Sequence, residues 1–273
     1  MKLRDFLYSL MVALLTFYIY APIVWIFITS IKPPGEEFRI PIEYLPSRPS
    51  IENYEIIFLE MGFQRYIFNS FVVATCTTAI VLLLSSMAAY AIARLKFKYN
   101  LNVLLLILTA GMMPPIVTVI TIFMIMRALG LLDTLLALIP PYTVWSLPLA
   151  VWIMTAYLVS IPKELEDSAK VDGCTPFKIF YKIILPLAKP GLFSAGILTF
   201  IYCLGELMFA LTLTFTPRSQ TLTVGLLNLR TVHYVPWGQM CAATISALLP
   251  VFFIVLVFQK WIIRGLTVGA LKY

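Results

Sequence analysis

Charged residues are scarce in this 273-residue chain: Asp, Glu, Lys and Arg together make up 12% of it, whereas 61% of the residues are hydrophobic. Soluble domains usually carry about 25% charged and 45–50% apolar residues. A water-soluble fold of this size has too little polar surface to cover so many apolar side chains. The mean hydropathy of +0.93 supports the same conclusion, that the chain resides in a lipid bilayer.

Three further absences exclude classes of function. The single histidine, His233, and the lack of a His, Asp and Glu cluster argue against a membrane enzyme that uses metal or acid–base chemistry. The cysteines Cys76, Cys174, Cys203 and Cys241 are scattered, with no C-x-x-C pair, so neither a pairing nor a metal site is implied. No G-x-x-x-x-G-K-[S/T] loop is present. An ATP-driven activity must therefore use a nucleotide site on another chain.

Long hydrophobic runs are what the sequence has instead. Five of them contain no charged residue, and a sixth contains only Glu206. Each run reaches the roughly 20 residues that a helix needs to cross a bilayer, and none shows the alternation typical of barrel strands. The sequence thus predicts an all-α, polytopic membrane protein with a single domain over residues 1–273. The six predicted spans lie at about 10–31, 67–92, 103–126, 134–159, 192–216 and 240–263.

The distribution of Lys and Arg predicts the orientation. With the N-terminus in the cytoplasm, 13 of the 20 basic residues fall on cytoplasmic segments and 7 on external ones, as the positive-inside rule requires. Both termini are therefore expected in the cytoplasm of a multi-pass cell-membrane protein. The first run is long for a signal peptide and lacks a small-x-small cleavage site, which favours a retained span. The net charge of +7 follows from this bias and implies no nucleic-acid partner.

Proline marks expected irregularities. The external segment 32–66 is rich in proline, which is typical of an ordered surface loop. Within the spans, prolines predict kinks or breaks at Pro114-Pro115, Pro140-Pro141, Pro148 and Pro250. A second external segment, 217–239, contains His233 beside Tyr234 and Trp237, which favours a position at the membrane interface over a ligand role.

The most specific pattern lies at 160–190, SIPKELEDSAKVDGCTPFKIFYKIILPLAKP. A first helix is predicted over 162–171, since its first turn is acidic and so complements the positive helix end. Gly173 readily takes the left-handed conformation after such a helix. A second helix then begins with Thr175 as N-cap and Pro176 at its first position. Two short helices at a tight angle form a rigid cytoplasmic feature, called here the knob (residues 160–190).

The spacing within the knob resembles a known motif. Asp167-Ser168-Ala169 is followed after three residues by Gly173, and after nine more by Ile183 and Leu185-Pro186. This resembles the cytoplasmic "EAA" loop of ATP-binding-cassette (ABC) import permeases, E-A-A, three residues, G, nine residues, I-x-L-P. Asp167 replaces the usual Glu, and Ser168 replaces the usual Ala.

Further stretches resemble the carbohydrate branch of that family, and in particular its maltose- and trehalose-type permeases. They resemble it over nearly the whole chain at Glu52-Asn53-Tyr54, Asn69-Ser70, residues 88–94, residues 130–134 and residues 264–272. The resemblance implies a permease that pairs with a sister permease, two ATP-binding-cassette ATPase subunits and an extracytoplasmic sugar-binding protein. ATP and Mg would bind the ATPases, and this chain, which is not an enzyme, would bind no cofactor or metal.

The resemblance also assigns roles to residues. The knob would sit in a groove on one ATPase, and it would transmit ATPase closure into alternating access, through Asp167, Ser168, Ala169, Gly173, Phe177, Ile183 and Pro186. The segment 217–239 would reach the binding protein, with candidate contacts at Asn228, His233, Tyr234 and Trp237.

Candidates for the substrate path come from residue type and position. Glu206 is the only acid inside a predicted span, where a charge usually faces a cavity or a partner, and a structural or gating role is favoured over ligand contact. Aromatic rings that can stack on sugar faces are Tyr142, Trp145, Trp152 and Tyr202. Interfacial belts and helix packing account for most such rings, so none is singled out.

Two other functions stay open at this point. An ABC permease for another small polar solute, such as glycerol phosphate, fits the same motifs. An ion-coupled secondary transporter is disfavoured, because such proteins usually show inverted repeats or several intramembrane carboxylates.

Overall fold

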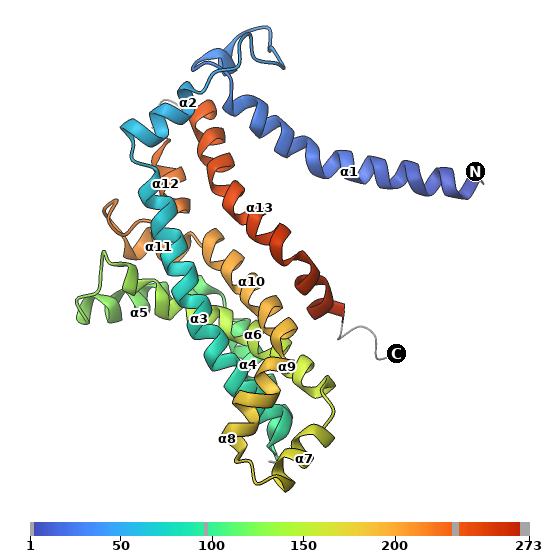
Figure 1. Ribbon diagram of the computed structural model, residues 1–273. Coiled ribbons are helices and arrows are strands. Elements are labelled where there is room, and N and C mark those ends of the chain that lie inside the picture. Colours follow the sequence, from blue (N-terminus) through green and yellow to red (C-terminus); the bar gives the residue numbers. More distant parts are fainter. Residues whose placement is uncertain (1–2, 96–97, 231–234, 268–273) are drawn as a thin grey trace. The chain divides into compact units, whose positions relative to one another are not determined.

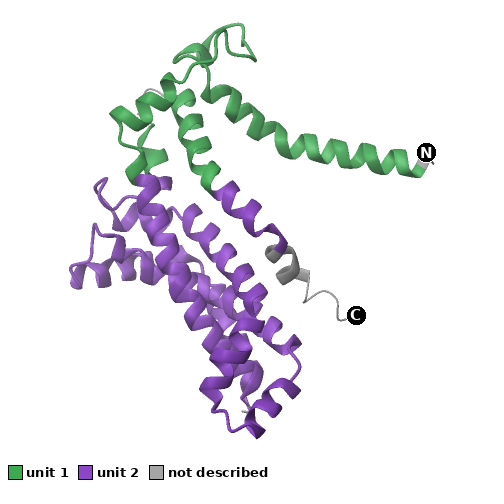
Figure 2. Cartoon of the chain, in the orientation of Figure 1, with its two compact units in different colours: residues 1–65, 225–250 green, residues 66–224, 251–273 purple. Residues whose placement is uncertain are grey.

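The computed structural model describes residues 3–95, 98–230 and 235–267 (Figure 1). By its internal contacts the chain divides into two compact units, residues 1–65 with 225–250 and residues 66–224 with 251–273 (Figure 2). The expectation of one permease domain over residues 1–273 stays a prediction. In the described part of the chain, every regular element is helical, as the sequence predicts.

The elements follow the chain in this order. Unit 1 contains α1 (Leu3–Ser30), η1 (Glu36–Phe38), α2 (Glu52–Glu55) and η2 (Ile56–Glu60). Unit 2 holds most of the rest: α3 (Gln64–Arg94), α4 (Asn100–Gly111), α5 (Pro115–Ala128), η3 (Leu135–Ala137), α6 (Ile139–Ser160), α7 (Glu164–Val171), α8 (Pro176–Ile179), η4 (Phe180–Ile184), α9 (Leu185–Leu187), α10 (Lys189–Gly205) and α11 (Met208–Leu213). Three helices have residues in both units: α3, whose first two residues, Gln64 and Arg65, belong to unit 1, α12 (Leu222–Asn228) and α13 (Trp237–Thr267).

Helix length and composition support a membrane protein. Among the described residues, four helical stretches are long and apolar enough to cross a bilayer unaided: Arg4–Ser30, Gln64–Arg94, Leu135–Ser160 and Trp237–Lys260. Two bent helix pairs bring the possible number of spans to six. The most hydrophobic window of α1 is 0% buried within the chain, so its apolar surface faces lipid or another subunit.

The third predicted span, 103–126, is broken. Helix α4 ends at Gly111 and α5 begins at Pro115, with a bend of 85° between them. Proline lacks a backbone N–H and disfavours a helical conformation in the residue before it, so the pair Pro114-Pro115 stops the helix. The expectation of a break at this position is therefore confirmed. Pro148 and Pro250, in contrast, lie inside continuous helical segments of α6 and α13.

The fifth predicted span, 192–216, is shorter than expected. Helix α10 begins earlier, at Lys189, and ends at Gly205; residues Glu206 and Leu207 are not helical, and the short α11 follows. Backbone polar groups at a helix end need partners. The hydrophobic run did not show the break because apolar residues continue on both sides of it.

Helix α6 lies at the centre of unit 2, where it packs against both α4 and α10. Two glycines allow close approach: a Cβ at Gly111 would lie 2.8 Å from Cγ of Pro148, and a Cβ at Gly191 would lie 2.8 Å from Cγ of Tyr157. Small residues at helix contacts let backbones come together in membrane proteins. The buried core around these helices includes Tyr142, Met154 and Leu158.

Asn53 organises the proline-rich segment of unit 1. Its Nδ2 donates to the carbonyl oxygens of Ser30 and Lys32, at 3.2 and 2.7 Å. The hydroxyl groups of Tyr54 and Ser30 lie 2.8 Å apart. Gly238 leaves room for this arrangement, because a Cβ there would lie 2.7 Å from Asn53 Nδ2. The Glu52-Asn53-Tyr54 stretch thus fastens α2 to the end of α1.

A second asparagine organises the end of unit 2 at which α3 begins. Asn69 Nδ2 donates to three carbonyl oxygens of the segment after α11, those of Pro217, Arg218 and Gln220. The adjacent Ser70 Oγ accepts from the backbone N–H of Leu222, at 2.7 Å. Asn69-Ser70 therefore holds the 217–222 segment against the start of α3.

Asp133 fixes the same segment from another side. Its carboxylate accepts from the backbone N–H groups of Phe215 and Thr216, at 2.8 and 2.9 Å, and from the hydroxyls of Thr216 and Ser219. Burial alone raises the pKa of Asp133, but these hydrogen bonds outweigh burial and hold the pKa well below its ordinary value. The residue has a positive φ of 59°, which Asp tolerates better than most residues.

Candidate functional site

The knob has the helix–turn–helix geometry that its sequence predicts, and it lies at one end of unit 2 (Figure 1). Gly173 has φ 75° and closes α7 with two hydrogen bonds: its N–H donates to the Lys170 carbonyl, and the N–H of Cys174 donates to the Ala169 carbonyl. This is the Schellman arrangement. Thr175 then caps α8 by accepting from the N–H of Lys178 at 3.4 Å. The turn is thereby fixed at both helix ends.

A buried ion pair attaches the knob to α3. Arg94 Nε lies 2.6 Å from Glu166 Oε1, and the two side chains are 3% and 7% exposed. The contact is an ion pair at close range and not a well-aligned hydrogen bond. Arg94 Nη2 also donates to the Ile161 carbonyl at 2.7 Å. One guanidinium thus holds both a backbone carbonyl in the turn between α6 and α7 and the Glu166 side chain within α7.

Apolar packing completes the attachment. Ile179 and Ile184 are 1% and 0% exposed, and Ala169 joins them in a core with residues of α3, α6 and α10. The ring of Phe180 lies 5.0 Å from that of Tyr90. Lys178 and Lys182 are exposed, as expected for the opposite face. The knob is therefore packed directly against helices α3, α6 and α10.

The outward face of the knob is unusually apolar for an exposed surface. Val171 is 88% exposed, Phe177 is 74% exposed and Tyr181 is 62% exposed. Large exposed apolar residues that gather on a rigid element typically mark a contact with another protein. These three exposed apolar side chains are called here the outer face of the knob (Val171, Phe177 and Tyr181).

The other predicted knob residues have distinct positions. Asp167 pairs with Lys170 at 2.8 Å on the surface, and the Ser168 hydroxyl donates to the Glu164 carbonyl. Ala169 is buried, Ile183 is half-buried against the core, and Pro186 is exposed in the first turn of α9. The buried acid of the motif region is Glu166, one residue before the expected position.

Glu206 occupies the break between α10 and α11. Both of its carboxylate oxygens lie 3.1 Å from the backbone nitrogen of Phe209, and one also accepts from Ala210 at 3.3 Å. Its carbonyl accepts from the Thr223 hydroxyl at 2.7 Å. A carboxylate at a helix N-terminus satisfies free N–H groups and complements the helix dipole. This contact pattern favours a structural role for Glu206.

Three of the four predicted aromatic residues gather around this break. The rings of Tyr142 and Tyr202 meet edge to face at 6.5 Å, and Trp145 packs on Phe209 at 5.2 Å. Tyr142 also lies near the Glu206 carboxylate. Trp145 Nε1 is buried without a hydrogen-bond partner. We call Tyr142, Trp145, Tyr202 and Glu206 the Glu206 cluster.

The remaining candidates do not join this cluster in the described structure. Trp152 is 52% exposed on α6, about 10 Å along the helix from Trp145. Asn228 ends α12 and is exposed, and Trp237 begins α13 and is 51% exposed. His233 and Tyr234 lie outside the described residues.

Sequence reasoning missed three contacts that organise the sites: the partner of Arg94, the three carbonyls held by Asn69, and the carboxylate cage of Asp133. All three residues lie in stretches that resembled the carbohydrate permeases. Because their partners lie 67 to 151 residues away, spacing along the chain could not identify them. A charged residue at the end of a long apolar helix was the one available signal for Arg94.

Comparison with known proteins identifies the class. Residues 81–268 match the family described as "Binding-protein-dependent transport system inner membrane component", and the chain belongs to that family. It is a multi-pass membrane transport subunit, as the EAA-like spacing predicts.

Similar proteins cover most of the chain. The sulfoquinovosyl glycerol transport system permease protein SmoH of Agrobacterium fabrum is 39% identical over 92% of this chain and 88% of its own length. The trehalose/maltose transport system permease protein MalG of Thermococcus litoralis is 37% identical, over 92% and 91%. The trehalose transport system permease protein SugB of Mycobacterium tuberculosis is 39% identical, over 93% of each chain.

A solved structure shares the fold. A chain in the crystal structure of a bacterial ABC transporter for import of the acidic polysaccharide alginate superposes with a TM-score of 0.80 at 20% identity, covering 95% of this chain and 96% of that one. At this identity the match supports the fold of the permease and leaves its substrate to other arguments.

Proposed function

We propose that this chain is a permease subunit of an ABC importer for a sugar or sugar glycoside. Together with a sister permease it forms the membrane path, and two ATPase subunits and an external binding protein complete the importer. The observation that carries the proposal is the outer face of the knob, an exposed apolar surface on an element that Arg94 and Glu166 fasten to α3. Such a face can receive a push from a partner and pass it on to the membrane helices.

The same geometry suggests how ATP drives transport. A rigid knob in a groove of an ATPase follows that subunit as it closes on ATP. Because the knob shares a core with α3, α6 and α10, its displacement tilts these helices and changes which side of the membrane the path opens to, by rocking of rigid parts. This placement puts the knob, and with it both termini, in the cytoplasm.

The relatives support the substrate class. SmoH, MalG and SugB are named for sulfoquinovosyl glycerol, trehalose/maltose and trehalose, each a sugar or glycoside. The Glu206 cluster offers a donor suited to such ligands, because Trp145 Nε1 is buried without a partner. Rings such as Tyr202 can stack on the apolar face of a sugar. Glu206 itself supports the site by capping α11.

Affinity purification of the tagged chain from its native membranes tests the assembly. We expect the ATPase and a second permease to copurify with the wild type. Phe177→Asp should lose the ATPase and retain the sister permease, because a charge on the outer face opposes burial. The matched control is Tyr44→Asp, another aromatic residue with 72% exposure, on the loop of unit 1; it should retain both partners.

Transport by the reconstituted complex tests the function. The copurified binding protein is titrated with trehalose, maltose, sulfoquinovosyl glycerol and glycerol phosphate, and the ligand that binds is then supplied to proteoliposomes. Uptake that depends on ATP supplied on the side of the membrane that carries the knob supports the importer. Uptake driven by an ion gradient without ATP would support the secondary transporter, and binding of glycerol phosphate alone would replace the sugar as substrate.

A further inference from the structure

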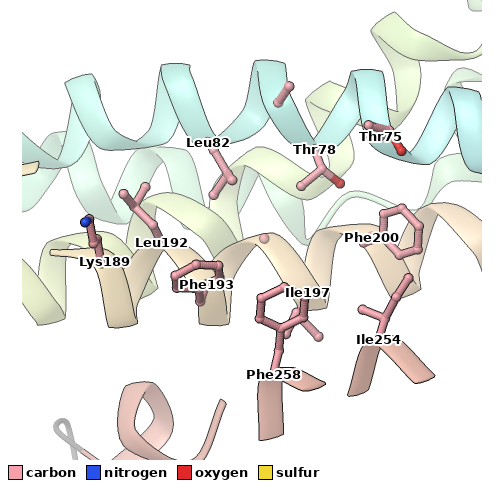
Figure 3. A pocket seen from close by; sticks show the side chains of 12 residues that line it. Thr75, Thr78, Leu82, Lys189, Leu192, Phe193, Ile197, Phe200, Ile254 and Phe258 are labelled. Atoms are coloured by element: carbon pink, nitrogen blue, oxygen red, sulfur yellow. The ribbon is translucent and has the colours of Figure 1, made fainter. Parts of the chain in front are cut away.

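An apolar groove of about 760 Å³ lies on unit 2 between α3, α10 and the second half of α13 (Figure 3). Its walls include Leu82 from α3, Leu192, Phe193 and Phe200 from α10, and Ile254 and Phe258 from α13. The rings of Phe193 and Phe258 stack 5.2 Å apart and form part of the wall. All of its lining residues belong to unit 2. Neither the knob nor the Glu206 cluster uses this surface.

The length of the groove matches one leaflet of a bilayer. Its lining residues on α10 run from Lys189 to Phe200, a rise of about 16 Å at 1.5 Å per residue. The hydrocarbon core of a bilayer is about 30 Å thick, so one leaflet contributes about 15 Å. An extended acyl chain can therefore lie along the whole groove.

The positive charge at one end of the groove is complementary to an anionic lipid headgroup. Lys189 is exposed at the first position of α10, and Figure 3 shows its nitrogen at the end of the row of apolar side chains. No acidic residue is among the described lining residues. A lysine at the end of a span places its stem along apolar surface and its ammonium at the level of the headgroups. Anionic headgroups of the cytoplasmic leaflet attract such a cation.

We propose that the groove binds one anionic phospholipid, with an acyl chain between α3, α10 and α13 and the headgroup phosphate on Lys189. The assignment to the cytoplasmic leaflet rests on the proposed function, which places the adjoining knob in the cytoplasm. The bound lipid fills the space between the three helices and supplies the counter-charge for Lys189.

Photo-crosslinking tests the proposal on the full transporter in vesicles. The probe is phosphatidylglycerol with a diazirine near the middle of one acyl chain, and the comparison probe is phosphatidylcholine with the same chain. Peptide mapping should place crosslinks within residues 192–200 and 254–258. Crosslinking should be about fivefold greater from phosphatidylglycerol, the factor that corresponds to one lysine at an anionic headgroup.

Two variants separate the parts of the site. Lys189→Gln should remove the preference for phosphatidylglycerol, whereas Lys98→Gln, an equal loss of charge outside the groove, should retain it. Gly196→Leu should lower crosslinking from both lipids, because it fills the groove; its Cβ would lie 3.2 Å from Leu82 Cδ1, the movable end of a side chain. The wild-type crosslink map remains decisive should this variant fold poorly.

Three results would overturn the proposal. The first is that crosslinks map only outside the groove, and the second is that both lipids crosslink equally in the wild type and in Lys189→Gln. The third is that a photoreactive residue placed at position 254 crosslinks to the sister permease. The readout needs no transport. Normal uptake without groove crosslinks therefore rejects the lipid site alone, and groove crosslinks in a complex without sugar uptake reject the proposed function alone.

Discussion

The two carboxylates that organise unit 2 are held in opposite ways. Glu166, in the knob, pairs with the guanidinium of Arg94, and both side chains are almost fully buried. Glu206, in the helix break, is held by the backbone N–H groups of Phe209 and Ala210. A buried ion pair contains two charges that each depend on the other, whereas a capped helix end contains one charge and several neutral donors. Loss of one member should therefore be far more damaging in the knob.

Arg94→Ala tests the more severe case. It leaves Glu166 buried without a counter-charge and frees the Ile161 carbonyl, so we expect a loss of about 3–5 kcal/mol in the free energy of unfolding. Thermal unfolding of the purified complex, with limited proteolysis at the knob, measures the effect. The control is Arg48→Ala, since Arg48 and Glu52 form an exposed pair and surface pairs contribute little.

A double variant sharpens this result. Arg94→Met with Glu166→Leu removes both charges, and we expect it to recover most of the stability lost in Arg94→Ala. Equal stability of Arg94→Ala and Arg48→Ala would contradict the buried-pair interpretation.

Substitution of Glu206 should have an intermediate effect. Glu206→Ala leaves the N–H groups of Phe209 and Ala210 without their acceptor, at a cost of about 2–3 kcal/mol. Glu206→Gln retains one oxygen acceptor and should lose less than half of that. Stability in detergent and sugar affinity should be measured together: a large loss of affinity in Glu206→Gln at normal stability would assign Glu206 to direct ligand contact.

Gly173 tests the geometry of the knob instead of its charge. Gly173→Val places a β-branched residue at φ 75°, which costs about 1–2 kcal/mol and distorts the turn. We expect ATP hydrolysis to become uncoupled from uptake. Gly205→Ala is the matched control, because no positive φ is present there and a Cβ would meet nothing within 4 Å. Coupled transport by Gly173→Val would reject the rigid knob.

The smallest effect is expected at Asp133, a third carboxylate, held by hydroxyl and backbone donors. Its pKa is lowered in the folded protein, so its contribution to stability is present above its unfolded pKa of about 3.9 and is lost as the pH falls through the folded value. Asp133→Asn should therefore flatten the acid side of the stability profile as the pH falls below about 4, as measured by unfolding at each pH. An unchanged profile would show that the Asp133 carboxylate does not contribute.

Local features were predictable from the sequence, and distant pairs were not. The Gly173 turn and the Thr175 cap were predicted because each depends on residues within a few positions. The break at Pro114-Pro115 was predicted for the same reason. The break at Glu206 was missed because the mean hydropathy of the segment reports a continuous apolar run. It carries no information on which backbone groups a carboxylate contacts. The partner of Arg94 depends on how α3 packs beside the knob, which no spacing along the chain encodes.

The glycine contacts on α6 also constrain how the permease can move. Gly111 touches Pro148, and Gly191 touches Tyr157, at distances that leave no room for a Cβ. If α10 slid along α6 by one residue, about 1.5 Å, a side chain would begin to occupy the space that the Tyr157 ring leaves only for glycine. We therefore expect α4, α6 and α10 to resist sliding along one another and to move together whenever the permease changes its conformation.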